Sequence, residues 1–320
     1  MVAHVAAHRG LGEDCEHMLD YTKRLVRAAS ATVRTPPWVA PGHYYSPVPG
    51  PADTARALNW REQALAAPAS ADALPGIDLN ADGQRALVKA LSGYFADVPT
   101  GPREGRRYRP ENNMYGLADA AVYHGMLRHF TPRRVVEVGS GYSSAIALDT
   151  ADRHLPDIEF TFIEPYPERL LGLLTEADKE RCTLLRTPVQ DAGLEPYATL
   201  AAGDFLFIDS THVSKAGSDV NFLFFEVLPR LAEGVIVHVH DVLWPFEYPT
   251  PWLREGRGWT EAYLLRAFLT HNSAFGIELF NSWIWQREAA LAAELLPAAA
   301  GQQPGGIWLR KRTADSSHSV

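Results

Sequence analysis

A short apolar segment that ends in glycines, RRVVEVGSGYSS at residues 133–144, constrains the fold of this chain more than any other feature. Its valines are β-branched and predict a buried strand. Gly139 and Gly141 then allow a tight turn, and residues 143–150 can open a helix. In such a unit the backbone N–H groups approach a ligand closely, and the helix N-terminus favours a carboxylate or phosphate. A lone Gly-x-Gly also occurs in structural turns, so other motifs of the chain are needed to tell a ligand site from a structural turn.

Patterns of helix and strand alternate after residue 118. Apolar spacing predicts strands at 134–138, 159–163, 183–185, 204–208 and 235–240. Helices are predicted at 118–129, 143–151, 167–174, 196–201, 220–231 and 260–271. Such units form a parallel, doubly wound α/β sheet. We expect two further strands, at 276–285 and 306–310, separated by a helix at 288–296.

The first 112 residues carry weaker patterns. Helices are predicted at 13–29, 54–67 and 80–95, whereas the Pro-rich stretch at 35–51 must run as a loop. We expect residues 1–112 to form an extension that packs on the core, because short helices are unstable alone. Residues 313–320 are expected to form a flexible tail.

Composition and charge exclude several classes of protein. The 320 residues are 46% hydrophobic and carry a net charge of −8 with scattered acids, unlike the clustered basic footprint of a nucleic-acid-binding protein. The one basic run, REGRRYR at 103–109, fits a solvated linker or an anion contact. No signal-type core or run of 18 apolar residues occurs, so we expect neither secretion nor membrane spanning. Cys15 and Cys182 lack the spacing of a zinc site or disulfide framework, which fits a reducing cytoplasm.

Glu164 ends the second predicted strand, where a ribose-binding acid belongs. Strand two lies beside strand one in such a sheet, so a carboxylate at its end can accept hydrogen bonds from two vicinal hydroxyls. A surface acid at a strand end is the alternative. Past strand three, the segment TPVQD places Gln190 and Asp191 where an adenine would lie, although Asp191 could instead cap a helix.

Strands four and five both end in titratable side chains. Asp209 and His212 follow strand four, and His240 with Asp241 ends strand five. Both strands open on the carboxyl edge of the sheet, so these four groups can converge above a ligand. Period-two alternation places His238 on the same face as His240 but one step down the strand, which predicts a packed, hydrogen-bonded core histidine.

The motifs VVEVGSGYSS, IEPYP, TPVQD, FIDSTH and HVHD together resemble those of class I S-adenosylmethionine-dependent methyltransferases, of the bacterial small-molecule type called methyltransferase family 24. The resemblance covers roughly residues 113–311, and we place the methyltransferase domain at 113–312. The end of the chain also resembles catechol-type O-methyltransferases, whose seven-stranded sheet closes with an antiparallel hairpin. The resemblance implies a Rossmann-like fold, S-adenosylmethionine as the cofactor and a small-molecule methyl acceptor.

The resemblance also implies roles for individual residues. Those that would hold the cofactor are Glu137, Gly139, Ser140, Gly141, Tyr142 and Ser143 for the methionine part, Glu164 for the ribose, and Gln190 and Asp191 for the adenine. In metal-dependent relatives a divalent cation, Mg²⁺ or Mn²⁺, is held at the positions of Asp209, His240 and Asp241; Asp209 could instead face the methionine amine. His240 departs from the usual acid, and imidazole suits transition metals better than Mg²⁺.

Two other classes of function stay open. An NAD-dependent oxidoreductase would need a glycine or alanine where Ser144 stands, and a second mononucleotide half in place of a closing hairpin. A metal-dependent hydroxylase-like protein, or a pure binding protein, would share the same fold.

For a hydroxyl acceptor a base must remove the proton, and the candidates are His212, His240 and Asp241; His212 could instead only order the loop after it. The aromatic residues that could wall the acceptor, or simply pack together, are Tyr44, Tyr45, Tyr108, Tyr115, Trp244, Phe246, Tyr248, Trp252 and Trp259. We expect the upstream residues to fold over the site as a lid. The expected acceptor is a hydroxyl of a sugar, phenol or natural-product intermediate, methylated by a cytoplasmic monomer or homodimer without nucleic-acid or membrane partners.

Overall fold

A computed structural model describes residues 38–68, 74–98 and 106–312. The predicted helix at 13–29, Cys15 and the predicted tail lie outside the described residues. The chain divides into two compact units, Met1–Ala55 and Arg56–Val320. In the first unit no regular element precedes Pro51 among the described residues, as predicted for the Pro-rich stretch. Everything below concerns the second unit unless stated otherwise.

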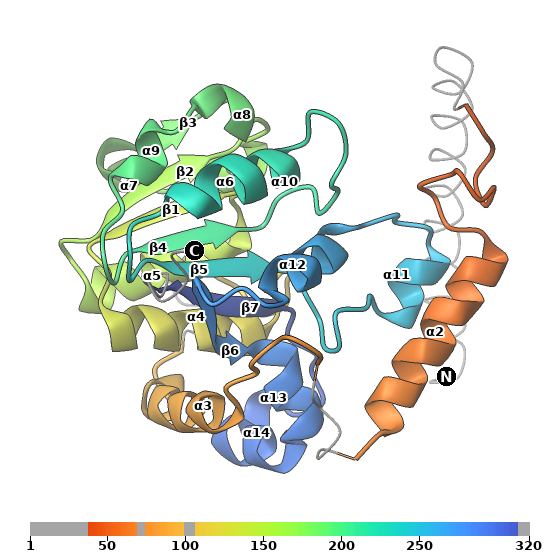
Figure 1. The fold of residues 1–320 in the computed structure, drawn as a ribbon. Helices are drawn as coiled ribbons and strands as arrows, with labels where there is room; N and C mark the ends of the chain where they lie inside the picture. Colours follow the sequence, from red (N-terminus) through yellow and green to blue (C-terminus); the bar gives the residue numbers. More distant parts are fainter. Residues whose placement is uncertain (1–37, 69–73, 99–105, 313–320) are drawn as a thin grey trace, which may run out of the picture. The chain divides into compact units, whose positions relative to one another are not determined.

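Seven strands form one sheet in the order β3-β2-β1-β4-β5-β7-β6 (Figure 1). The strands are β1 (Arg134–Val138), β2 (Glu159–Ile163), β3 (Thr183–Leu185), β4 (Phe205–Ile208), β5 (Ile236–His240), β6 (Phe275–Phe280) and β7 (Gly306–Lys311). The first five are parallel, and β7 pairs antiparallel with both β5 and β6. This arrangement confirms the predicted Rossmann-like sheet with an antiparallel end. It also argues against the NAD alternative, because the second parallel half is missing from the described sheet.

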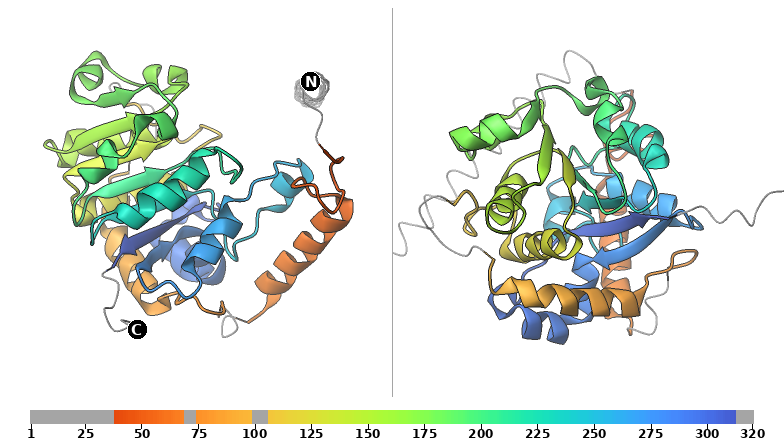
Figure 2. Two further views of the ribbon diagram at one scale, coloured as in Figure 1. Left: turned by 45° about the horizontal axis from the view of Figure 1, so that its top comes forward. Right: turned by 90° about the vertical axis from the view of Figure 1, so that its left-hand side faces the viewer.

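Helices alternate with the strands along the chain. The long ones are α2 (Pro51–Ala66), α3 (Ala81–Phe95), α4 (Leu117–Phe130), α5 (Tyr142–His154) and α12 (Glu261–Leu269). The short ones are α6 (Glu168–Leu171), α7 (Glu176–Arg181), α8 (Val189–Ala192), α9 (Glu195–Ala198), α10 (Asp219–Phe222), α11 (Thr250–Arg254), α13 (Asn281–Arg287) and α14 (Ala289–Leu295). A π-helical turn (Leu223–Val227) and a 3₁₀ turn (Leu228–Arg230) continue α10, and another 3₁₀ turn spans Pro297–Ala299. Helices α4 and α5 lie on one face, and α10 with α12 lies on the other (Figure 2).

The core is built from strands that are apolar on both sides. All four residues of β4 (FLFI) are buried, as parallel strands covered on two faces require. Helix α4 is buried along most of its length because α3 packs on its outer side, where a side chain at Gly125 would meet Leu91 at 3.1 Å. Residues 81–95 thus pack on α4 in this structure, whereas the predicted extension over residues 1–112 stays a prediction.

Several element predictions were wrong or incomplete. Residues 281–285, predicted as the end of a strand, begin α13 instead. Phe280 pairs with Ile307, next to the first residue of β7, so a longer β6 would have no partner. Within this helix the side chains of Trp283, Ile284 and Trp285 are still buried. The short helices α7, α8 and α11 were not predicted, since helices of one or two turns carry too few residues for a periodic signal.

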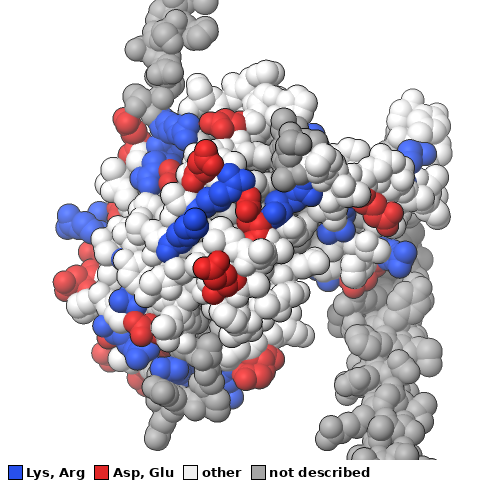
Figure 3. All heavy atoms as spheres, turned by 90° about the horizontal axis from the view of Figure 1, so that it is seen from below, with Lys and Arg blue, Asp and Glu red and all other residues white. Residues whose placement is uncertain are grey.

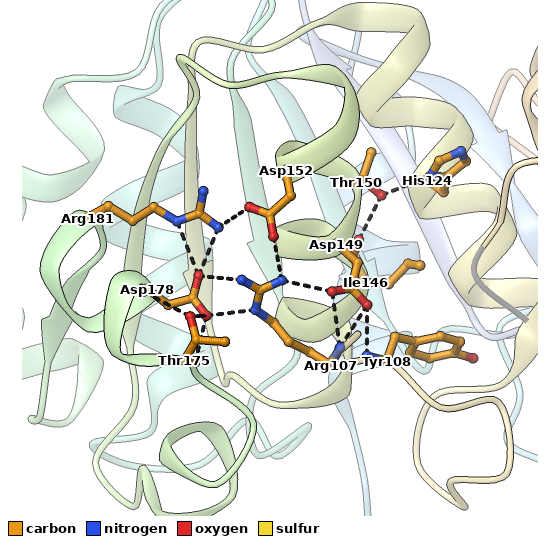
Figure 4. A network of polar contacts seen from close by, with 10 residues as sticks. All are labelled: Arg107, Tyr108, His124, Ile146, Asp149, Thr150, Asp152, Thr175, Asp178 and Arg181. Carbon is orange, nitrogen blue, oxygen red and sulfur yellow. Dashed lines mark hydrogen bonds and ion pairs between the residues drawn. The ribbon is translucent and has the colours of Figure 1, made fainter. Parts of the chain in front are cut away.

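The described part of the basic run, residues 106–109, is not a solvated linker throughout, because Arg107 pairs with carboxylates inside the protein. Arg107 is buried, and its guanidinium donates to both carboxylate oxygens of Asp178, each at 2.7 Å (Figure 4). It also donates to Asp149 at 2.9 Å and to Asp152 at 2.7 Å. Its positive charge is thus used inside the protein to fix the segment before α4 onto α5 and α7.

Charges of both signs are interspersed over the described residues on the face shown in Figure 3. This distribution agrees with the absence of a basic footprint in the sequence. None of the helices in the described part of the chain has the length and apolar character that crossing a membrane requires.

Candidate active site

The glycine turn lies at the carboxyl edge of the sheet, between β1 and α5. Gly139 has a φ of 78°. A Cβ at this position would lie 1.7 Å from the backbone oxygen of Asp209, so no other residue fits. The predicted strand–turn–helix unit is confirmed, and its turn packs directly against the end of β4.

Glu137 is fully buried beneath this turn. Its Oε1 accepts hydrogen bonds from the hydroxyls of Ser143 at 2.6 Å and Ser144 at 2.8 Å, and the hydroxyl of Ser144 accepts one from the N–H of Gly141 at 3.0 Å. Burial raises the pKa of Glu137 to about 8, and the two serine hydroxyls oppose that shift. Oε2 has no partner among the described residues. Glu137 therefore stabilises the turn from below; its contact with the cofactor stays a prediction.

Glu164 follows β2 and faces the turn across a short gap. Its Oε2 accepts a hydrogen bond from the N–H of Ser140 at 3.1 Å, and its Oε1 accepts one from the N–H of Tyr166 at 2.8 Å. Both bonds fix the carboxylate at the rim of a cavity of about 470 Å³. The side chain of Arg169, which sequence reasoning missed, lies over Gly141 at the same rim.

The cavity joins this turn to the ends of β4 and β5. Its lining comprises Asn113, Met114, Tyr115, Gly139, Ser140, Gly141, Tyr142, Ser143, Glu164, Arg169, Asp209, Ser210, Thr211, His212, His240, Asp241, Trp252, Arg257 and Trp259. Most of the residues predicted for the cofactor therefore share one cavity with all of those predicted for catalysis.

Asp209, His240 and Asp241 form a cluster in which one ligand atom from each residue lies within 4.8 Å of the others. The ring of His238 contacts Phe207 and Trp308 in the core, and its Nε2 lies 3.3 Å from Nδ1 of His240. His238 is thus the packed core histidine that was predicted. Its contact leaves Nε2 of His240 facing Asp241, at 3.6 Å from Oδ1.

The donor set fits a divalent cation. Two carboxylates and one imidazole are a common ligand combination for transition metals, and the ligand atoms already lie near the separation that a shared ion would need. The contact from Nε2 of His238 to Nδ1 of His240 would then hold the metal-binding ring in its orientation.

His212 lies between three carboxylates. Its Nδ1 is 2.9 Å from Oε2 of Glu261, and its Nε2 is 3.4 Å from Oδ1 of Asp209 and 3.6 Å from Oδ2 of Asp241. Burial alone would lower the pKa of His212, but Asp209 and Glu261 raise it well above its usual value. The three carboxylates therefore favour the charged form of the ring. Its backbone oxygen also accepts hydrogen bonds from Thr260 and Glu261, so it orders that segment as well.

Burial and the neighbouring charges together set the pKa values of the other groups in the cluster. Burial would lower the pKa of His240, but Asp209 and Asp241 raise it above its usual value. Burial would raise the pKa of Asp209, yet the imidazoles of His240 and His212 hold it below its usual value. Burial raises the pKa of Asp241. Glu261 was missed by sequence reasoning, because an acid in the first turn of a helix usually only stabilises that helix.

A second cavity of about 450 Å³ adjoins the first and shares Asn113, Met114, His240, Asp241 and Trp252 with it. Asp119, in the first turn of α4, lines the second cavity. Burial raises its pKa to about 7. Sequence reasoning missed this residue too, since nothing in the spacing of α4 marks it.

Several predicted site residues lie elsewhere. Trp244, Phe246 and Tyr248 are buried in the core and line neither cavity; Trp252 and Trp259, farther along the same segment, form the aromatic wall instead. The segment turns inward after β5, so its first aromatic side chains fill the space beside β6, where Phe246 contacts Phe280.

The predicted aromatic residues that precede α4 also lie in different places. Tyr115 lines the first cavity, with its ring centroid 5.0 Å from that of His240. Tyr108 is fully buried and donates to the backbone oxygen of Tyr115, so it is a core residue. Tyr44 and Tyr45 belong to the first unit, and the lid stays a prediction.

The two adenine candidates do not line the described cavity. The Gln190 side chain donates to the backbone oxygen of Gly217 at 2.7 Å, and its own amide oxygen is buried without a partner among the described residues. Asp191 is exposed within α8 and caps no helix, so the capping alternative was wrong.

Comparisons with known proteins agree with this geometry. A family model described as a methyltransferase domain matches residues 136–242, which run from β1 to just past β5. An uncharacterized protein of Archaeoglobus fulgidus is 35% identical over 167 residues, covering 50% of this chain and 72% of that protein.

Two solved structures are also similar to the chain. The O-methyltransferase TomG of Streptomyces achromogenes, in complex with SAM, is 18% identical and covers 71% of this chain and 89% of its own, with a TM-score of 0.42. The SAH-bound Podospora anserina methyltransferase PaMTH1 is 17% identical and covers 75% and 98%, also with a TM-score of 0.42. Likeness at this level carries no functional argument. On the family match and the archaeal relative, the chain belongs to the class I methyltransferase family, whose cofactor is S-adenosylmethionine, as its motifs predicted.

Proposed function

We propose that this protein transfers a methyl group from S-adenosylmethionine to a hydroxyl of a small-molecule acceptor. The observation that carries the proposal is the shared cavity. The glycine turn and Glu164 line this cavity together with the cluster of Asp209, His212, His240 and Asp241. A cofactor held by the turn presents its methyl group toward groups that can handle the proton of an acceptor.

The cofactor side uses backbone and carboxylate groups. The N-terminus of α5 favours the cofactor's carboxylate, and the bare turn at Gly139 lets the backbone approach it. Glu164, already oriented by Ser140 and Tyr166, accepts from the ribose hydroxyls. The contact of Gln190 and Asp191 with the adenine stays a prediction.

The reaction breaks the bond between the methyl carbon and sulfur and forms a bond from that carbon to the acceptor oxygen. The hydroxyl proton passes to a base as the oxygen attacks in line. We assign the base to Asp241, whose carboxylate lines both cavities, because both ring nitrogens of His212 already face other carboxylates. The ring of His212, whose charged form these carboxylates favour, then stabilises the negative charge that develops on the acceptor oxygen.

A divalent cation held by Asp209, His240 and Asp241 would, when bound, orient the acceptor oxygen and lower its pKa.

Calorimetry with S-adenosylhomocysteine tests the cofactor side. Glu164→Ala removes one or two charge-assisted hydrogen bonds of ~1.5–3 kcal/mol each, so the affinity should fall at least about tenfold. Glu159→Ala is the matched control, since Glu159 begins the same strand and is exposed, and it should leave the affinity unchanged. Binding of NAD without any response to S-adenosylhomocysteine would overturn the proposal.

A further inference from the structure

The second cavity contains a buried acid that the protein itself leaves unsatisfied. Asp119 is 8% exposed, and its Oδ1 has no hydrogen-bond partner among the described residues. The Asn281 side chain and the Gly305 backbone engage the same carboxyl group, which holds it in place. Because Asp119 lines the cavity, a molecule held there that donates a hydrogen bond can reach this carboxyl group.

We propose that the second cavity receives the body of the acceptor, that this acceptor is a neutral hydroxyl-rich molecule the size of a sugar ring, and that Asp119 accepts a hydrogen bond from one of its hydroxyls. The inference rests on the proposed function and deepens it. Asp119 is thereby a specificity-determining residue, separate from the group that takes the reacting proton.

The cavity wall combines apolar residues with amide side chains. Its lining comprises Asn112, Asn113, Met114, Gly116, Asp119, His240, Asp241, Leu243, Pro249, Trp252, Gln302, Gln303, Pro304 and Gly305. Amide side chains offer donors and acceptors together, which is what a ring of hydroxyl groups needs. The oxygen of Gln302 accepts from the N–H of Ala118 at 2.9 Å, so its NH₂ group faces other partners.

The same wall disfavours the other acceptor classes. No Lys or Arg belongs to the described lining, so an anionic acceptor would meet Asp119 and Asp241 without a compensating cation from a long side chain. A phenol favours flat apolar walls, and Trp252 is the one Trp, Tyr or Phe of this lining. A single aromatic face beside several amides instead suits the apolar face and the hydroxyl edge of a sugar.

The position of the cavity connects it to the chemistry. His240 and Asp241 line both cavities, so a molecule seated beside Asp119 presents its nearest hydroxyl to the cluster where the methyl group arrives. A volume of about 450 Å³ lies within the range of small-molecule sites.

Saturation-transfer NMR on the protein loaded with S-adenosylhomocysteine tests the inference. The probes are methyl α-glucoside, catechol and n-hexylamine, each titrated against the wild type, Asp119→Asn and Asp119→Ala. Asp82→Asn is the matched control, because Asp82 is also an acid in the first turn of a helix but is fully exposed. Asp119→Asn keeps the size of the side chain, so it remains informative where Asp119→Ala perturbs the fold.

We expect methyl α-glucoside to bind the wild type and the Asp82→Asn variant equally, and to bind at least five-fold more weakly to both Asp119 variants. Affinity for S-adenosylhomocysteine should stay within two-fold throughout. No binding of the glucoside, equal binding by the Asp119 variants, or Asp119-dependent binding of catechol or the amine in its place would each overturn the inference. Failure to bind S-adenosylhomocysteine would refute the proposed function instead, which separates the two.

Discussion

Replacing Arg107 by methionine should destabilise the fold strongly. The guanidinium is the cation shared by Asp149 and Asp178, whose side chains are 4% and 0% exposed. Burial alone would raise the pKa of Asp178, but hydrogen bonds from Arg107 and Thr175 lower it to about 2. A lowering of the pKa of this size corresponds to at most about 2.5 kcal/mol for that carboxylate. Asp178 keeps its bonds from Thr175 and Arg181, and Asp149 keeps those from two backbone N–H groups, so the expected loss is ~3 kcal/mol, the lower end of what breaking a buried ion pair costs.

Urea unfolding followed by circular dichroism at pH 7 measures this loss. Arg128→Met is the matched control, because Arg128 pairs with the half-exposed Asp97 at 2.7 Å and should cost at most about 1 kcal/mol. The pKa of Asp178 is depressed in the folded state, so the stability it contributes is complete above about pH 4 and is lost as the pH falls toward 2. The Arg107→Met deficit should therefore shrink in acid. A loss at pH 7 no greater than that of Arg128→Met would refute this account of the network.

Three further predictions concern other sites. His124 is buried, and burial lowers its pKa to about 4. The free energy of unfolding should therefore fall by about 2 kcal/mol between pH 7.5 and pH 5, because only the unfolded chain takes up the proton in that range. Urea titrations of His124→Gln should show a weaker dependence of stability on pH, whereas those of His129→Gln, at an exposed position, should match the wild type. Gly139→Ala should abolish S-adenosylhomocysteine binding in calorimetry, because its Cβ would collide with the backbone of Asp209. Gly203 has a similar φ but open space around it, so Gly203→Ala should lower the free energy of unfolding by only about 1–2 kcal/mol. Excess chelator should reduce methyl transfer, and Mn²⁺ should restore it better than Mg²⁺; full turnover in chelator would leave the cluster a role in proton transfer alone.

Much of the catalytic edge could be predicted because strand ends are local signals. A buried β-branched run followed by glycines or acids marks where a strand stops, and parallel strands bring those ends together. This is why Glu164, Asp209, His240 and Asp241 could be placed at one edge before the fold was known. Their distances depend on register, which pairs Val138 with both Ile163 and Ile208.

The remaining features depend on contacts distant in sequence. Arg107 meets Asp178 across 71 positions, and nothing near either residue reveals the pairing. Glu261 reaches His212 over 49 positions for the same reason. Aromatic content alone also cannot separate Trp252, in the cavity wall, from Trp244, in the core, since the direction of the chain after β5 decides which side chains face inward.

Two of the catalytic candidates hold backbone conformations that only glycine adopts freely. His212 has a φ of 60° and Asp241 a φ of 55°, each at a cost of about 1–2 kcal/mol. A glycine at either position would relax the backbone while removing the side chain that the reaction needs. Selection for heat resistance and selection for turnover therefore pull these two positions in opposite directions. A library enriched only for thermal survival would accumulate inactive proteins at these positions, whereas one enriched for turnover would retain the strain.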